Sequence, residues 1–219
     1  MFWLTAAQAV VTLLAGLNLV VPAMAGRVGV GEFVRWREMF SLLFVTPVSA
    51  GLMVSAVWLL ERGRRDSWGP MLAIGIAVGL VAVSMGVHEP INVMGRAACE
   101  RLAQSVFFWD EVFSHAVFFA GYAGVSVALL WSQARNPLGG AMGRAPMIAF
   151  LGCGVVTGAG IYFSLVKAPQ IRVDLWVIAG VLVMAEVMRW GTPFRRLPLA
   201  VALETGYALA LAGLMLRGH

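Results

Sequence analysis

Charged residues, cysteines and lysines are all scarce in this chain, and each scarcity excludes a class of protein. Charged residues make up 12% of the sequence against 60% apolar residues, with a mean hydropathy of +0.85, which leaves too little polar surface for a water-soluble particle. The two cysteines, Cys99 and Cys153, are too few for a disulfide framework. The single lysine, Lys167, ends an apolar run well before the last one, which argues against a retinal-type pigment. The composition therefore predicts an integral membrane protein.

Seven apolar runs are separated by short charged connections. A bilayer core about 30 Å thick requires roughly twenty apolar residues at a rise of 1.5 Å each. No connection is long enough for a soluble domain, so we expect one all-α membrane domain over residues 1–219, a bundle of about seven transmembrane helices. These helices are expected near residues 2–26, 39–60, 70–88, 105–132, 145–167, 172–190 and 197–217.

The basic residues do not decide the orientation. The 16 Lys and Arg residues divide equally between the two sets of alternate connections, so neither side has the excess of positive charge that marks cytoplasmic loops. They are scattered beside apolar runs, where such residues usually meet lipid headgroups. We therefore expect membrane lipids as partners, no nucleic acid, and a multi-pass location in the bacterial inner membrane.

Small residues predict where helices approach closely. Gly75 and Gly79 lie four apart in one apolar run, and Gly154 and Gly158 lie four apart in another. This spacing lets the backbones of two membrane helices come together. We expect tight packing at both pairs.

Ionisable side chains gather in one part of the sequence. Such a group at membrane depth costs about 2.5–3.5 kcal/mol on insertion scales, so each one is a functional hypothesis. Residues four apart share a helix face. Three pairs have this spacing: Ser84 and His88, Asp110 and Ser114, Glu111 and His115. We predict a site between the helices near 70–88 and 105–132, with the catalytic candidates Ser84, His88, Asp110, Glu111 and His115.

The same residues suit several chemistries. Two neighbouring buried carboxylates repel each other, so either one is neutral or a cation, an arginine or a histidine shares the pocket. Two imidazoles and a carboxylate are an adequate ligand set for zinc or non-haem iron, which makes His88, Glu111 and His115 candidate metal ligands. Their spacing matches no dedicated zinc motif. We also expect His115 to lie one or two turns deeper than His88, and His88 could be solvated at a helix end before Pro90.

The ionisable side chains of this region could also have purely structural roles. His115 could hydrogen-bond only Glu111 within its own helix, and Asp110 could contact Arg96 or Arg101 at the interface. In either case the side chains would be tolerated in the membrane without any catalytic role.

Two further carboxylates, Glu186 and Glu204, flank the sixth connection, which opens on the opposite side of the membrane. We expect them to pair with Arg189, Arg195 or Arg196 instead of reaching the histidines.

The pattern of Ser84, three residues, then His88, followed by Asp110 and Glu111 near the start of the next helix, resembles the first two motifs of the CREST superfamily. That group includes alkaline ceramidases and the progestin and adipoQ receptors. The resemblance implies seven helices and an intramembrane zinc site for amide hydrolysis, with Ser84, His88 and Asp110 in the family's roles. It covers about 30 residues. The family's last helix carries His-x-x-x-His, whereas Leu203–Tyr207 of this chain contains no histidine. The family's three-histidine zinc site therefore cannot form here. If a metal is bound, Glu111 and His115 would have to replace the missing ligands.

Three classes of function are compatible with this site. The first is an intramembrane enzyme for a lipid or other hydrophobic substrate, either a metal-dependent hydrolase or a metal-free acid–base cyclase or isomerase of an isoprenoid-type substrate. The second is a proton- or cation-coupled transporter, although no inverted repeat is visible. The third is a haem carrier with His88 and His115 as axial ligands, for which two carboxylates are a poor environment. We expect the enzyme.

Overall fold

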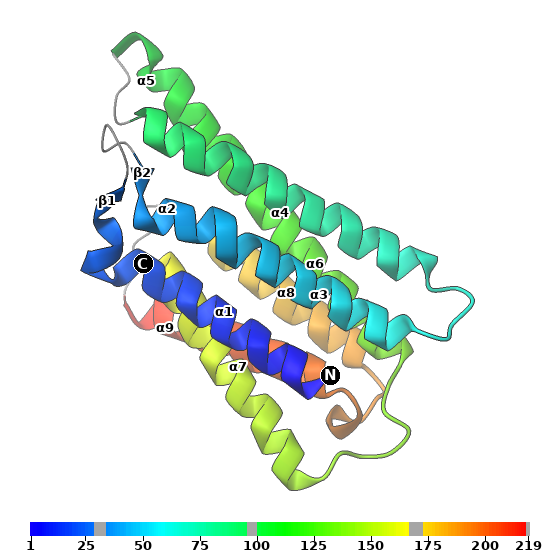
Figure 1. Ribbon diagram of the computed structural model, residues 1–219. Helices are drawn as coiled ribbons and strands as arrows, with labels where there is room; N and C mark the ends of the chain where they lie inside the picture. Colours follow the sequence, from blue (N-terminus) through cyan, green and yellow to red (C-terminus); the bar gives the residue numbers. More distant parts are fainter. Residues whose placement is uncertain (29–33, 96–99, 167–172, 218–219) are drawn as a thin grey trace.

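The computed structural model describes residues 1–28, 34–95, 100–166 and 173–217. Cys99 and Lys167 lie outside these ranges. Nearly all of the described chain is helical, which confirms the all-α prediction (Figure 1). The helices in chain order are α1 (Phe2–Val20), α2 (Trp36–Phe40), α3 (Thr46–Glu61), α4 (Trp68–Gly95), α5 (Glu100–Phe107), α6 (His115–Arg135), α7 (Arg144–Leu165), α8 (Val173–Arg189) and α9 (Pro198–Leu216). Shorter elements are the 3-10 turns η1 (Pro22–Ala25) and η4 (Phe194–Arg196), the π-helical segments η2 (Ser41–Val45) and η3 (Phe108–Ser114), and the strands β1 (Arg27–Val28) and β2 (Val34–Arg35).

The membrane-crossing helices match the apolar runs of the sequence. Six described stretches are long and apolar enough to cross a membrane: Phe2–Val20, Trp36–Glu61, Trp68–Met94, Leu102–Arg135, Arg144–Leu165 and Pro198–Leu216. The seventh expected span corresponds to α8, whose 17 residues are at the short end for a crossing helix. The long helices lie side by side in one bundle (Figure 1). The chain is therefore a multi-pass membrane protein.

The first helix ends earlier than predicted. We expected it to reach residue 26, but α1 ends at Val20. Pro22 follows and disfavours helical backbone at the residue before it, and Val21 is extended with φ −75° and ψ 119°. The chain beyond this point forms η1 and then β1, which pairs antiparallel with β2.

The third crossing helix ends later than predicted. We expected it to stop at residue 88 before Pro90, but α4 runs through Pro90 to Gly95. Proline removes one backbone hydrogen bond, and helices in membranes tolerate this where neighbouring groups compensate. The next helix also starts early, at Glu100, so both histidines of the predicted site lie within helical segments.

Glycines set the closest helix contacts. An added Cβ at Gly154 would lie 2.6 Å from the carbonyl oxygen of Ala202, and one at Gly158 would lie 2.7 Å from that of Gly206. This confirms the expected close packing of α7, which meets α9 here. The prediction for Gly75 and Gly79 is wrong, because no atom of the described chain lies within 4 Å of either added Cβ.

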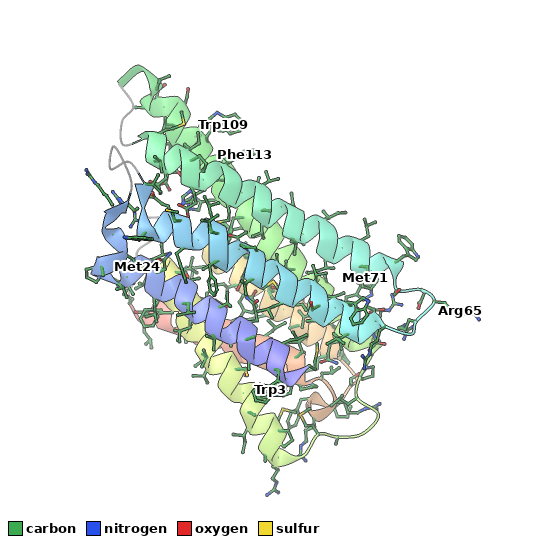
Figure 2. All side chains as sticks on the ribbon, in the orientation of Figure 1. Trp3, Met24, Arg65, Met71, Trp109 and Phe113 are labelled. Carbon is green, nitrogen blue, oxygen red and sulfur yellow. The ribbon has the colours of Figure 1, made fainter. Side chains whose placement is uncertain are left out.

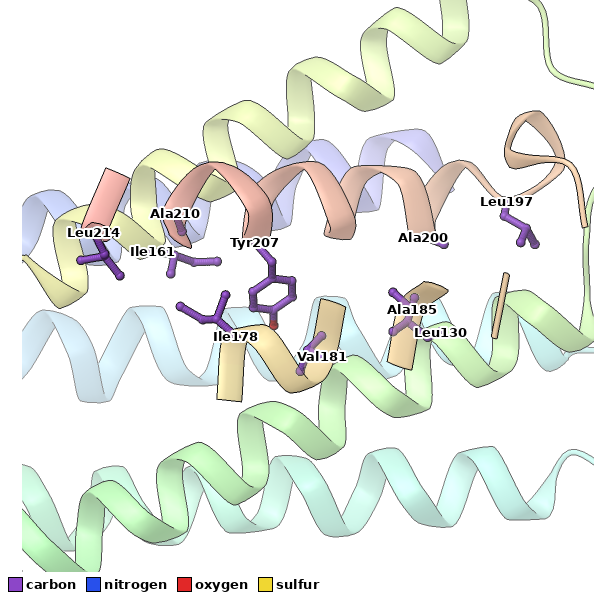
Figure 3. Packing of buried hydrophobic residues seen from close by; sticks show 10 residues of the cluster. All are labelled: Leu130, Ile161, Ile178, Val181, Ala185, Leu197, Ala200, Tyr207, Ala210 and Leu214. Atoms are coloured by element: carbon purple, nitrogen blue, oxygen red, sulfur yellow. The ribbon is translucent and has the colours of Figure 1, made fainter. Parts of the chain in front are cut away.

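An apolar cluster fills the space between α6, α7, α8 and α9 (Figure 3). Its largest member is Tyr207, which is 1% exposed and reaches from α9 toward α6, where its hydroxyl lies 2.5 Å from Oγ of Ser126. A second cluster joins α3, α4 and α6 around Val57, Ile74 and Ala128. Together they hold α6 in the centre of the bundle.

A charged network closes the end of the bundle opposite α5. Nε of Arg64 donates to Asp66 at 3.1 Å and Nη2 of Arg135 donates to it at 2.5 Å. The buried carboxylate of Glu61 accepts from Nδ2 of Asn136 at 3.1 Å. The hydrogen bond from Arg64 lowers the pKa of Asp66, and the charge of Arg135 lowers it further. These contacts tie the connection between α3 and α4 to the end of α6.

We predict that Arg64→Gln raises the pKa of Asp66 toward the ordinary aspartate value of about 3.9. Because the folded pKa is lowered, the pairing stabilises the closed connection above the ordinary pKa and is lost as the pH falls through the lowered one. NMR titration of the Asp66 carboxyl measures the change. Arg62→Gln is the matched control, and an equal shift in both variants would contradict the assigned pair.

Candidate functional site

The structure brings His88 of α4 against Asp110 of η3. Nδ1 of His88 lies 2.7 Å from Oδ1 of Asp110, and the two side chains are 24% and 14% exposed. The two groups lie within ion-pair distance on different helices, although Oδ1 of Asp110 accepts no hydrogen bond from the described residues. A half-buried histidine held by a carboxylate is therefore the centre of the candidate site.

Two buried serines brace this pair. Oγ of Ser84 donates to the carbonyl oxygen of Ser114 at 2.7 Å, linking α4 to η3. Oγ of Ser114 donates to the carbonyl oxygen of Asp110 and lies 3.4 Å from Nδ1 of His88. The hydroxyl of Ser84 is thus committed to a backbone carbonyl, which fits a positioning role better than that of a nucleophile. Ser114 was noted in the sequence only for its spacing from Asp110, and its bridging role needs the fold.

Glu111 and His115 form a second pair beside the first. Nδ1 of His115 lies 2.9 Å from the carbonyl oxygen of Glu111 and 3.6 Å from its Oε2. The rings of His88 and His115 have centroids 5.1 Å apart and are tilted by 60°. This separation is less than the 5.4 Å rise of one helical turn. A depth difference of two turns is therefore wrong, and the two rings lie within about one turn of each other.

The backbone of η3 is itself unusual. Residues Phe108–Ser114 are π-helical between two α-helical segments, and they carry Asp110, Glu111 and Ser114. A π-helical segment adds a residue to the turn and re-aims the side chains after it, and such segments occur frequently at functional sites. Three of the polar side chains of this site owe their direction to it.

The exposed surface beside the site is apolar. Phe107 at the end of α5 and Phe108, Trp109 and Val112 in η3 are all exposed. Figure 2 shows Trp109 and Phe113 near the α5 end of the bundle. The half-exposed His115 lies on the same helix. This part of the chain therefore presents an apolar surface beside the polar pairs.

Glu89 is a buried carboxylate that our site prediction did not include. It is 7% exposed and lies within electrostatic reach of His88 and Asp110 on one side and of Arg37 and Glu38 on the other. Its position next to a histidine inside an apolar run was the available signal. It extends the polar region from α4 toward α2.

The metal hypothesis gains no support from the geometry. In the described ranges, no three His, Cys, Asp or Glu side chains are grouped closely enough to hold a metal ion. Nδ1 of His88 and Nδ1 of His115 face protein oxygen atoms. The set of His88, Glu111 and His115 is therefore not arranged as a metal site, and zinc or iron stays a prediction.

The remaining sequence predictions have different outcomes. Arg189 contacts Glu186 at 2.5 Å and Glu204 at 3.3 Å, so the expected pairing of these carboxylates is confirmed. The alternative partners of Asp110, Arg96 and the side chain of Arg101, lie outside the described residues.

Comparison with known protein families, with curated proteins and with solved structures gives no match. The likeness to the CREST superfamily therefore rests on the sequence pattern alone. Any function must be argued from the geometry of the site.

Proposed function

We propose that this chain is an intramembrane enzyme of the bacterial inner membrane that acts on a lipid or other hydrophobic substrate. The contact of 2.7 Å between Nδ1 of His88 and Asp110 carries the proposal. In this proposal Asp110 accepts the Nδ1 proton during the reaction, which fixes the imidazole tautomer and leaves Nε2 as a base. Catalytic histidines are often held by a carboxylate in this way.

In this proposal, the pair of His88 and Asp110 and the pair of Glu111 and His115 each carry out one proton transfer. Nε2 of His88 takes a proton from a water molecule or from the substrate, and Asp110 stabilises the imidazolium that forms. Glu111 and His115, whose ring lies 5.1 Å from that of His88, supply the second acid–base group directly beside the first. Ser84 and Ser114 hold the first pair at its short distance. This division suits either an isomerisation or cyclisation, which adds one proton and removes another, or the addition of water to a carbonyl.

The hydrophobic substrate class is inferred from the apolar surface beside the site. Its polar groups are half-buried at one end of the bundle, and the exposed side chains around η3 are aromatic and aliphatic. A substrate with a long apolar part would stay in the lipid while its reactive group reaches His88. We favour the metal-free chemistry because the described residues do not form a metal-ligand group. Metal-dependent hydrolysis, as the CREST resemblance implies, is the alternative.

A substrate screen tests this function. Purified protein in lipid nanodiscs is incubated with amide and ester lipids and with isoprenoid alkenes and epoxides, and products are detected by mass spectrometry. We expect conversion of one class, and we expect it to survive a strong chelator. Loss of conversion on chelation, restored by zinc or iron, would favour the metal-dependent alternative. No conversion, together with proton uptake into proteoliposomes, would contradict an enzyme and favour transport.

Alanine at Glu111 or His115 is expected to lower product formation by about 10²-fold or more, the usual contribution of a general acid or base. Alanine at Glu186 or Glu204 is expected to leave the rate per folded molecule nearly unchanged, because these residues pair with Arg189 elsewhere in the bundle. The rate is normalised to the monodisperse protein recovered from size-exclusion chromatography. Equal tolerance at all four positions would contradict the proposed site.

A further inference from the structure

A cavity with several hydrogen-bonding groups in a mainly apolar wall lies within the bundle, apart from the pair of His88 and Asp110. It has a volume of about 50 Å³ and lies between α1, α3, α6, α7 and α9. Its hydrogen-bonding lining includes Thr5, Gln8, Thr12, Ser126 and Tyr207. The nearest lining residue on α6, Tyr122, is seven residues beyond His115, about 10 Å along the helix. The cavity is therefore a separate feature of the fold.

On the α1 side, one side-chain atom of Gln8 has no hydrogen-bond partner. Its Nε2 donates to Oγ of Ser49 at 2.7 Å and to Oγ1 of Thr12 at 3.2 Å. Its Oε1 is buried and has no hydrogen-bond partner among the described residues. A buried amide oxygen without a donor is costly, and lipid offers none. This wall of the cavity therefore requires a donor.

The opposite wall carries hydroxyl groups. Oγ of Ser126 and the hydroxyl of Tyr207 lie 2.5 Å apart, and both residues are fully enclosed by the bundle (Figure 3 shows Tyr207). Oγ of Ser126 donates to the carbonyl oxygen of Tyr122 at 3.0 Å, so the Tyr207 hydroxyl donates to Ser126 and the two oxygens retain free lone pairs. The cavity thus has hydrogen-bond acceptors on α1 and on α6 and α9, which a molecule with two O–H donors can join.

The cavity volume limits which molecules can bind there. One water molecule needs about 10–15 Å³ of such a cavity, so this one accommodates about three. A lipid tail or an isoprenoid chain is too large. Buried apolar cavities stay dry, but a polar cavity with several hydrogen-bonding groups holds water.

We propose that the cavity binds a small cluster of water molecules that joins Oε1 of Gln8 to the hydroxyls of Ser126 and Tyr207. The cluster gives the unpartnered amide oxygen its donor. It also links α1 and α3 to α6 and α9 through hydrogen bonds at the centre of the membrane. This hydration site is independent of the catalytic proposal.

Hydroxyl-radical footprinting of the full protein in nanodiscs tests the cavity for water, because X-rays generate radicals from bound water next to the residues that it touches. We expect labelling of Tyr207 well above that of Met147. Met147 is similarly buried and does not line the cavity, although methionine is intrinsically the more reactive side chain. Labelling of Tyr207 at or below the level of Met147 would show a dry cavity and overturn the proposal.

Two variants test the named groups. Gln8→Leu removes the open acceptor at similar size, and Ser126→Ala removes one hydroxyl, so we expect labelling of Tyr207 to fall toward the Met147 level in both. Thr205→Ala is the control, because Oγ1 of Thr205 donates to the carbonyl of Val201 in its own helix. If Gln8→Leu does not fold, Ser126→Ala decides alone. Undiminished labelling in the folded variants would overturn the assigned water site.

Discussion

Asp110→Asn is expected to lower product formation by about 10³-fold or more while leaving the fold intact. The amide has the size of the carboxylate but lacks its charge, so it no longer stabilises the imidazolium of His88. It can also turn its NH₂ group toward Nδ1, which places the proton on Nε2 and removes the base. Because the side chain is only 14% exposed, no solvent-borne ion replaces the lost charge.

The matched control for this change is Glu204→Gln, which also neutralises a half-buried carboxylate in the membrane region, 17% exposed and paired with Arg189. We expect its rate per folded molecule to stay within a few-fold of the wild type. Rates are compared for each variant after the recovered protein is shown to be monodisperse. An Asp110→Asn enzyme as active as the control would contradict the role of the carboxylate.

Gly160→Ala is expected to destabilise the bundle by about 3 kcal/mol. An added Cβ would lie 2.4 Å from the carbonyl oxygen of Thr12 and 2.6 Å from the nitrogen of Leu13. Both are backbone atoms of α1, so no side chain can turn away and the two helices must separate. The facing glycine, Gly16, is equally confined, with its added Cβ 2.3 Å from the carbonyl oxygen of Gly160.

The free energy of unfolding in mixed detergent micelles measures this effect. Gly79→Ala is the control, because nothing in the described chain lies within 4 Å of its added Cβ, and we expect unchanged or slightly higher stability. If both alanine variants were equally stable, the close approach of α1 and α7 would be wrong.

The number and order of the helices were predictable because lipid imposes a strong requirement on sequence. Each crossing helix must be long, apolar and fully hydrogen-bonded, and this leaves a clear pattern. The helix ends were less predictable. Proline stopped α1 at Val20 yet was accepted within α4 at Pro90, because the outcome depends on the neighbouring helices, which a single sequence does not show.

The residues of the site were more predictable than their arrangement. Ionisable groups in apolar runs are rare, so His88 and Asp110 stood out by composition alone. Their contact depends on how far α4 and α5 extend and on the π-helical turn of η3, and neither leaves a recognisable local signal. The glycine pairs were equally hard to interpret from the sequence. Gly75 and Gly79 have the same spacing as Gly154 and Gly158, but only Gly154 and Gly158 lie against a neighbouring helix.

A double-mutant comparison tests most directly whether His88 and Asp110 act as one unit. Product formation is measured for His88→Ala, for Asp110→Ala and for the variant with both changes. A cooperating pair predicts that the double variant is about as slow as the slower single variant, because removing either member already disables the other. Losses that multiply in the double variant would mean independent contributions and would contradict the acid–base pair.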